Sequence, residues 1–131
     1  MLAILQPEGW AKPKGYANGI AASGRHIFVA GQIGWNGDCV FESDDLVDQM
    51  RQALENVVAV LAAAGAGPEH VASMTWYLVD KSDYLRNLSG IGQAWRDTMG
   101  RNFPATAVVQ VVALMEDRAK IEIQAHAVLP G

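Results

Sequence analysis

The fold is decided by the stretch SDDLVDQMRQALENVVAVLAAAGAGP, residues 43–68. Its apolar residues recur at intervals of three and four, which places them on one side of an α-helix. These residues are Leu46, Val47, Met50, Leu54, Val57, Val58 and Leu61. Ser43 is the predicted N-cap, and the glycines and proline of GAGP end the helix near Ala64. The stripe predicts a long helix that lies on a β-sheet.

The segment before this helix predicts a β-hairpin. Residues 16–34 alternate small or apolar residues with polar ones, and SGR at residues 23–25 supplies a turn. Gly31 and Gly34 interrupt the second strand. Because a glycine has no side chain, another backbone or a ligand can approach closely there.

The segment after the helix predicts a strand, a second helix and a second hairpin. Residues 71–80 are rich in β-branched and aromatic residues and predict a strand. Ser82 is the predicted cap of a helix over residues 82–99, which two internal glycines weaken. Apolar runs at residues 105–114 and 119–129 predict two strands joined by the turn MEDR.

This order of elements predicts an α+β fold, a mixed β-sheet with two helices packed on one face. The opposite face also needs cover, because VVQVV and IFVA carry apolar residues on both sides of their strands. In so small a domain, that face meets either solvent or another copy of the chain. We therefore expect an oligomer.

Composition narrows the class of protein. The 131 residues predict one domain, 1–131, and 50% of them are hydrophobic, enough for a real core. The longest apolar runs are too short for a membrane helix, and no basic segment precedes an apolar run at the N-terminus, so we expect a cytoplasmic protein without a membrane partner. The net charge of −4 with no basic block argues against a nucleic-acid partner.

Cysteine and histidine give no sign of a metal or nucleophilic site. Cys39 is the only cysteine, and its neighbours supply neither a base nor an oxyanion site. His26, His70 and His126 lack metal-ligand spacing. We expect an ordinary reduced thiol, no metal and no other cofactor.

Several short motifs, in their order and spacing, resemble those of one family. They are GY at residues 15–16 before a small-residue hairpin, AGQIG at residues 30–34, the long central helix, FPA at residues 103–105 and KIEIQAHAV at residues 120–128. Together they make the chain similar to the reactive-intermediate deaminase family, RidA or YjgF, also called endoribonuclease L-PSP. The likeness spans nearly the whole chain.

The resemblance implies a fold, an assembly and an activity. Family members have a chorismate-mutase-like α+β fold and form homotrimers, with three sheets facing inward as a barrel and three clefts at the subunit boundaries. Some members hydrolyse enamines and imines of amino-acid origin, such as 2-aminoacrylate. The implied partners are therefore a small-molecule ligand and two further copies of the chain.

The departure from the family pattern that bears most on the substrate is at Thr106. In members that hydrolyse small imino acids, an arginine follows the FPA-like segment and holds the substrate carboxylate, whereas this chain has Thr106. A guanidinium makes a two-pronged, charge-assisted contact with a carboxylate, and a hydroxyl offers one neutral donor. The loss is about 2 to 3 kcal/mol, or ~30- to 150-fold in affinity. Thr106 therefore removes the usual carboxylate anchor.

Other family positions are retained. The resemblance implies that Tyr16 lines the cleft and that Glu122 orients the attacking water and shuttles protons. It also implies that Gly31 contacts the ligand through its backbone. Ala107, beside Thr106, and Val108, where a cysteine is common in the family, are further ligand-binding candidates.

Each of these residues also has a purely structural interpretation. Tyr16 can close the edge of the barrel with its hydroxyl in water, and Glu122 can be a solvated residue of an alternating strand. Gln124 and His126 share the face of Glu122 by period two, so Gln124 is a candidate for the polar wall of the cleft. His126 is more simply a hydrogen-bonded interface residue than a base.

The sequence leaves two main functions open. The first is an imine or enamine hydrolase whose substrate is non-standard because of Thr106, with Glu122 and Tyr16 as catalytic residues. The alternative is a non-catalytic, metabolite-binding trimer of the same family. A ribonuclease is a third candidate with little support, because basic residues are few. Spacing does not decide whether Arg25, Arg101 or Arg118 replaces the missing arginine.

Overall fold

A computed structural model describes residues 2–131. The strands are β1 (Leu2–Leu5), β2 (Gly19–Ala22), β3 (Arg25–Ile33), β4 (Val71–Leu78), β5 (Ala105–Gln110) and β6 (Ile121–Leu129). The helices are α1 (Leu46–Ala63), α2 (Lys81–Arg86) and α3 (Leu88–Met99), with a single 3-10 turn at Pro68–His70.

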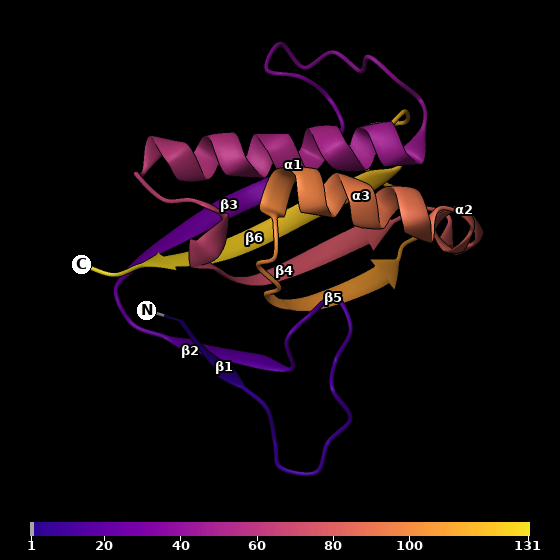
Figure 1. Cartoon of the computed structure of the whole chain (residues 1–131). Helices are drawn as coiled ribbons and strands as arrows, with labels where there is room; N and C mark the ends of the chain where they lie inside the picture. The colour runs from indigo at the N-terminus through magenta and orange to yellow at the C-terminus, as the bar shows by residue number, and fades with distance from the viewer. Residues whose placement is uncertain (1) are drawn as a thin grey trace.

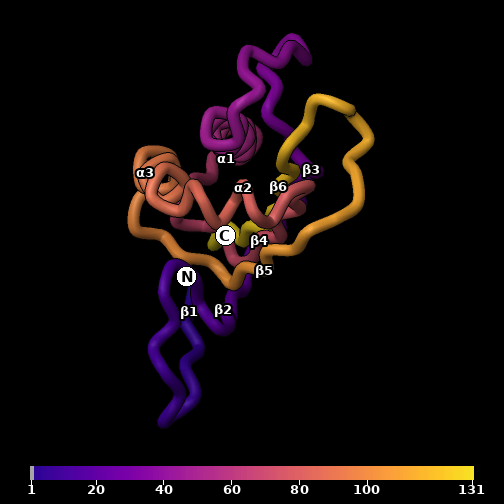
Figure 2. The backbone as a smooth tube through the Cα atoms, turned by 90° about the vertical axis from the view of Figure 1, so that its right-hand side faces the viewer, coloured from indigo at the N-terminus to yellow at the C-terminus, as the bar shows by residue number. Residues whose placement is uncertain are grey.

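The main sheet has four strands in the order β3-β6-β4-β5. Only the β4–β5 pair is parallel, so the sheet is mixed. Helices α1 and α3 lie side by side on one face of the sheet (Figure 1). Strands β1 and β2 form a separate two-stranded sheet that projects away from these helices (Figure 2). The expected α+β fold, with helices on one face of a mixed sheet, is confirmed.

Helix α1 forms where the apolar stripe predicts it. Met50, Leu54, Val57 and Leu61 are completely buried against the sheet. The N-cap differs from the prediction, because the Asp45 carboxylate accepts a hydrogen bond from the Asp48 amide at 3.0 Å. The expected cap, Ser43, instead donates its hydroxyl to the Asp48 side chain at 2.8 Å.

The predicted hairpin over residues 16–34 is wrong. Strands β2 and β3 form on either side of the expected turn, but β2 pairs with β1 and β3 pairs with β6. Gly24 has a φ of +147° and packs against the Leu129 carbonyl at the end of β6. The backbone at this glycine therefore does not form a hairpin turn. Strand β1, which pairs with β2, was not predicted.

The predicted C-terminal hairpin is also wrong. Strand β5 is shorter than expected and pairs in parallel with β4, while β6 lies between β3 and β4. The helices α2 and α3 carry the chain from β4 back to the same end of the sheet, which makes the next strand parallel. The long connection over residues 111–120 then lets the chain cross to the centre of the sheet.

The second predicted helix is divided in two at Asn87. The Asn87 side-chain amide donates to the Asp83 carbonyl at 2.7 Å, so it occupies an acceptor at the end of α2. Asp80, and not the expected Ser82, caps α2 by accepting from the amides of Ser82 and Asp83. The two glycines near the start of α3 do not break it.

The sheet face opposite the helices carries a mixed set of side chains. Phe28, whose side chain stacks on His126 at 4.5 Å, is 75% exposed on this face. His126 Nε2 lies 2.8 Å from His26 Nδ1, within hydrogen-bond distance. Among the described helices, none combines the length and the apolar character needed to cross a membrane.

Candidate functional site

A small pocket opens on the sheet face opposite the helices, where β3, β6 and β4 meet. Gly31, Tyr77, Glu122 and Gln124 line it, and its volume is about 290 Å³. Its remaining wall comes from the connection after β5, through Val111, Ala113, Leu114 and Met115. The Glu122 carboxylate, the Gln124 carboxamide and the Tyr77 phenol therefore face an apolar wall, as in many small-ligand sites.

A β-bulge brings Gly31 against Glu122. The β3–β6 register shifts between Val29 and Gln32, which inserts one extra residue into β3. A Cβ at Gly31 would collide with Glu122 Oε2 and would lie 2.7 Å from Glu122 Cδ. Only glycine leaves room for the carboxylate at this place, so the bulge fixes how close the acid lies to the β3 backbone.

The polar residues of this pocket follow from strand alternation. Glu122 is paired with Tyr77 and Gln124 with Thr75 across the β4–β6 ladder, so all four side chains share one face. The Tyr77 hydroxyl donates to Gln124 Oε1 at 3.4 Å, a long hydrogen bond. Glu122 is only partly buried, so water can reach its carboxylate.

Tyr16 and Thr106 lie outside this pocket, on two segments that one parallel bridge joins. Ala17 forms a parallel bridge with Ala105, and the Ala17 amide donates to the Pro104 carbonyl at 3.1 Å. This places the loop that carries Tyr16 along the start of β5. Neither Tyr16 nor Thr106 lines the Glu122 pocket. The Thr106 hydroxyl donates to the Pro104 carbonyl at 2.9 Å.

The β4–β5 register shows that Thr106 and Glu122 project from opposite faces of the sheet. Thr106 pairs with Met74, and Val108 pairs with Trp76, whose side chains are buried on the helix side.

Ala107, between them, pairs with Thr75 and so shares the open face with Gln124. In one chain, the predicted site residues therefore form two groups. Gly31, Glu122 and Gln124 are together, and Tyr16, Thr106 and Val108 are apart from them.

Sequence reasoning missed Tyr77 and the apolar wall at residues 111–115. Tyr77 had a usable signal, because it alternates with Trp76 and Leu78, two large apolar residues expected in the core. The wall had none, since residues 111–114 were assigned to a strand and the pairing of that strand was wrong. Correct pairing is needed before the connection can be placed over the pocket.

None of the three candidate arginines lines the Glu122 pocket. Arg118 Nε donates to Asp44 Oδ1 at 2.9 Å, and its guanidinium lies 5.3 Å from the centre of the Phe41 ring. Arg25 begins β3, whereas Glu122 pairs with Ile33 at the other end of that strand. Arg101 lines a different and larger pocket, of about 570 Å³, beneath α3.

No metal site is formed by the part of the chain that the structure describes. Over residues 2–131, no three side chains of the types His, Cys, Asp and Glu gather where they can hold a metal ion. Cys39 is exposed and has a φ of 61°, which places it in a turn.

The chain is similar to proteins of known sequence over nearly its full length. It is 34% identical to the RutC family protein PH0854 of Pyrococcus horikoshii, covering 97% of this chain and 98% of that protein. It is also 34% identical to the human 2-iminobutanoate/2-iminopropanoate deaminase, covering 79% of this chain and 73% of that one.

The fold is similar to those of solved structures. The Rid family protein YyfB of Yersinia pestis, a protein of unknown function, has a TM-score of 0.87 at 32% identity, covering 98% of both chains. The YjgF gene product of E. coli has a TM-score of 0.68 at 31% identity, covering 86% of this chain and 87% of that one. The sequence profile of the family Endoribonuclease L-PSP matches residues 10–129. The chain therefore belongs to the Endoribonuclease L-PSP family, the RidA/YjgF family that its sequence motifs resemble.

Proposed function

We propose that this protein is a hydrolase of the imine and enamine deaminase type. The observation that carries the proposal is the Glu122 carboxylate, held against Gly31 in a pocket that water can enter. A relative, the human protein described above, is named a 2-iminobutanoate/2-iminopropanoate deaminase. Because Thr106 stands where an arginine is usual, we propose a substrate other than small α-imino acids.

The chemistry requires one group that accepts and returns a proton. An enamine first becomes its imine by moving a proton from nitrogen to carbon. The Glu122 carboxylate takes a proton from water as the water oxygen attacks the C=N carbon, and then gives that proton to nitrogen. This gives a carbinolamine; its hydroxyl proton then passes through the same carboxylate to nitrogen as the C=O bond forms and the C–N bond breaks, and ammonia and a carbonyl product leave. General acid–base catalysis of this kind contributes ~10²- to 10⁴-fold.

We further propose that the complete site forms between copies of the chain in a homotrimer. Glu122 and Thr106 project from opposite faces of one sheet, so they cannot line one cleft within a single chain. The open sheet face also carries Phe28, which is 75% exposed, and a second copy would cover it. Sedimentation velocity would give one species at three times the chain mass, and a stable single subunit would refute the shared cleft.

The activity is tested with imines made in place by an amino-acid oxidase. Stopped-flow absorbance follows the loss of imine with and without the protein. The panel includes small α-imino acids and imines without an α-carboxylate. We expect acceleration over buffer, with a preference for the second group. If no imine is hydrolysed faster than in buffer, the hydrolase is refuted.

A binding protein without turnover is the second candidate. The substitution at Thr106 favours it, because a lost carboxylate anchor removes part of a catalytic site while leaving the pocket. The hydrolase and the binding protein predict different results when imines are added. A binding protein would show ligand-dependent fluorescence of its four tryptophans but no hydrolysis sensitive to Glu122.

Changing Gly31 to alanine should lower imine hydrolysis about tenfold. The new Cβ occupies the place of the Glu122 carboxylate, so the acid must rotate away from its position. A misplacement of about 1 Å can cost up to ~100-fold, and the flexible glutamate recovers part of this. Gly37→Ala is the matched control, because a Cβ there has no neighbour within 4 Å. Equal activity in the two variants would contradict the role of the Gly31–Glu122 contact.

A further inference from the structure

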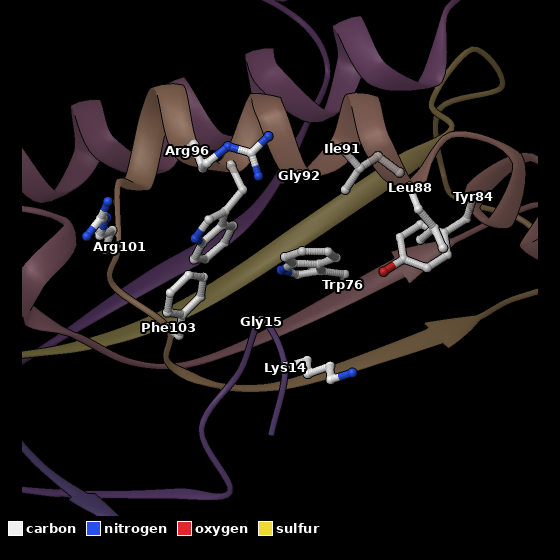
Figure 3. A pocket seen from close by; sticks show the side chains of 11 residues that line it. Lys14, Gly15, Trp76, Tyr84, Leu88, Ile91, Gly92, Arg96, Arg101 and Phe103 are labelled. Carbon is white, nitrogen blue, oxygen red and sulfur yellow. The ribbon is translucent and has the colours of Figure 1, made fainter. Parts of the chain in front are cut away.

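A second pocket, larger than the Glu122 pocket, is separate from that site. It has a volume of about 570 Å³ and lies between α3, β4 and the loop that carries Lys14 and Gly15 (Figure 3). Glu122 is on the opposite face of the sheet from Trp76, which lines this pocket. The volume is in the range of pockets that hold small organic ligands.

Aromatic rings form the wall of this pocket. The Trp95 ring stacks on Phe103 at 6.3 Å between centroids, and it contacts the Trp76 ring at 5.7 Å. Tryptophan and phenylalanine faces bind flat apolar groups well. Such a wall is suited to a planar ring system.

The charged residues of the pocket are all positive. Lys14, Arg96 and Arg101 line it, and no Asp or Glu is among its lining residues. Figure 3 places Arg96, Arg101 and Phe103 toward one end, and Tyr84 and Leu88 at the other. Burial raises the pKa of Tyr84, so its phenol adds no negative charge near neutral pH.

Carboxylates outside the pocket do not cancel this charge completely. Asp97 is the acid nearest in sequence to Arg96, and it accepts a hydrogen bond from Arg51 at 2.9 Å. This hydrogen bond with Arg51 contributes more to the lowered pKa of Asp97 than the nearby charge of Arg96 does. Arg96 itself donates to the neutral Gln93 side chain at 3.1 Å. The arginine end of the pocket therefore favours an anion.

Two indole N–H groups also lack an acceptor. Within residues 2–131, Trp76 Nε1 and Trp95 Nε1 are buried without a hydrogen-bond partner. These side chains are only 7% and 6% exposed, and both line the pocket. Figure 3 shows the nitrogen of Trp76 on the side of its ring nearest Phe103, toward the arginine end. Buried polar groups usually have a hydrogen-bond partner, so a ligand acceptor that reaches these nitrogens would supply a partner that the described chain does not.

We propose that this pocket binds a small, flat aromatic carboxylate. Its ring lies along the Trp76, Trp95 and Phe103 rings, and its carboxylate lies toward Arg96 and Arg101. A guanidinium contacts both oxygens of a carboxylate, which a lone lysine does not do. This site goes beyond the proposed hydrolase and does not depend on it.

Isothermal titration calorimetry with 2-naphthoate and with the neutral 2-naphthamide tests the proposal. We expect the carboxylate to bind at least about tenfold more tightly than the amide. Arg101→Gln should weaken 2-naphthoate binding about tenfold and leave 2-naphthamide binding unchanged. Arg25→Gln, at the start of β3, is the matched control and should change neither.

A second variant tests the location without removing charge. Gly92 lines the pocket within α3, and a leucine there fills the space while favouring the helix. Gly92→Leu should abolish binding of both ligands, and Glu122→Gln should alter neither. The proposal is overturned if 2-naphthoate does not bind the wild-type protein, or if Arg101→Gln and Gly92→Leu both bind it normally. A protein that binds 2-naphthoate but hydrolyses no imine would refute the proposed hydrolase and not the proposed carboxylate site.

Discussion

Glu122→Gln should lower kcat for imine hydrolysis at least about 100-fold. Glutamine keeps the size and position of the side chain against Gly31, but it cannot accept a proton from water or return one to nitrogen. Because both steps use the same carboxylate, the variant loses both at once. Rates are compared by stopped-flow with the substrate that the wild-type protein hydrolyses best.

The control for this variant is Glu8→Gln, an exposed glutamate in the loop before Tyr16. It removes the same charge and should keep full activity. The thermal unfolding temperature of Glu122→Gln should match that of the wild type, because the side chain is only partly buried. A Glu122→Gln protein that retains a third of the wild-type rate would remove Glu122 from the mechanism.

Thr106→Arg should lower KM for small α-imino acids ~30- to 150-fold. The guanidinium restores a two-pronged contact with the substrate carboxylate, in place of one hydroxyl that already donates to the Pro104 carbonyl. Thr106 is half-buried on β5, an edge strand, so the longer side chain can extend toward a neighbouring copy. The measurement is the KM for an imino acid made by an amino-acid oxidase.

Thr106→Gln is the matched control, since it has length without charge and should leave KM near the wild-type value. Imines without an α-carboxylate should gain nothing from either change. If Thr106→Arg does not lower KM for any imino acid, then position 106 does not meet the substrate carboxylate in this protein. The explanation of its substrate preference would then fail.

The sequence predicted the helices better than the pairing of the strands. The stripe from Leu46 to Leu61 is a local pattern, and a local pattern is enough to place α1 within a few residues. Which strand pairs with which depends on the whole chain. Gly24 looks like a hairpin turn in sequence, yet its contact with the Leu129 carbonyl belongs to β6, more than 100 residues away.

The candidate site could be predicted as a set of residues but not as an arrangement. Gly31, Glu122 and Gln124 do line one pocket, because a bulge brings Gly31 against Glu122 and the two-residue period of β6 places Gln124 on the same face. The period could be read from the sequence, whereas the bulge was not predicted. Thr106 and Val108 do not join them, because β5 pairs with β4 and so presents these side chains on the helix side. Tyr16 does not join them either, because the loop that carries it runs along the start of β5. Resemblance to a family indicates which residues are candidates for the site. The pairing register of the strands is needed to tell on which face of the sheet each residue lies.

The placement of Glu122 and Thr106 on opposite sheet faces has a genetic consequence. Suppose that each cleft joins one face of a subunit to the other face of its neighbour. A trimer that mixes subunits from two defective alleles then still contains some intact clefts. One allele would lack the acid and the other would be damaged near Thr106. Such alleles would complement each other in a heterozygous cell, whereas two alleles with lesions on the same face would not.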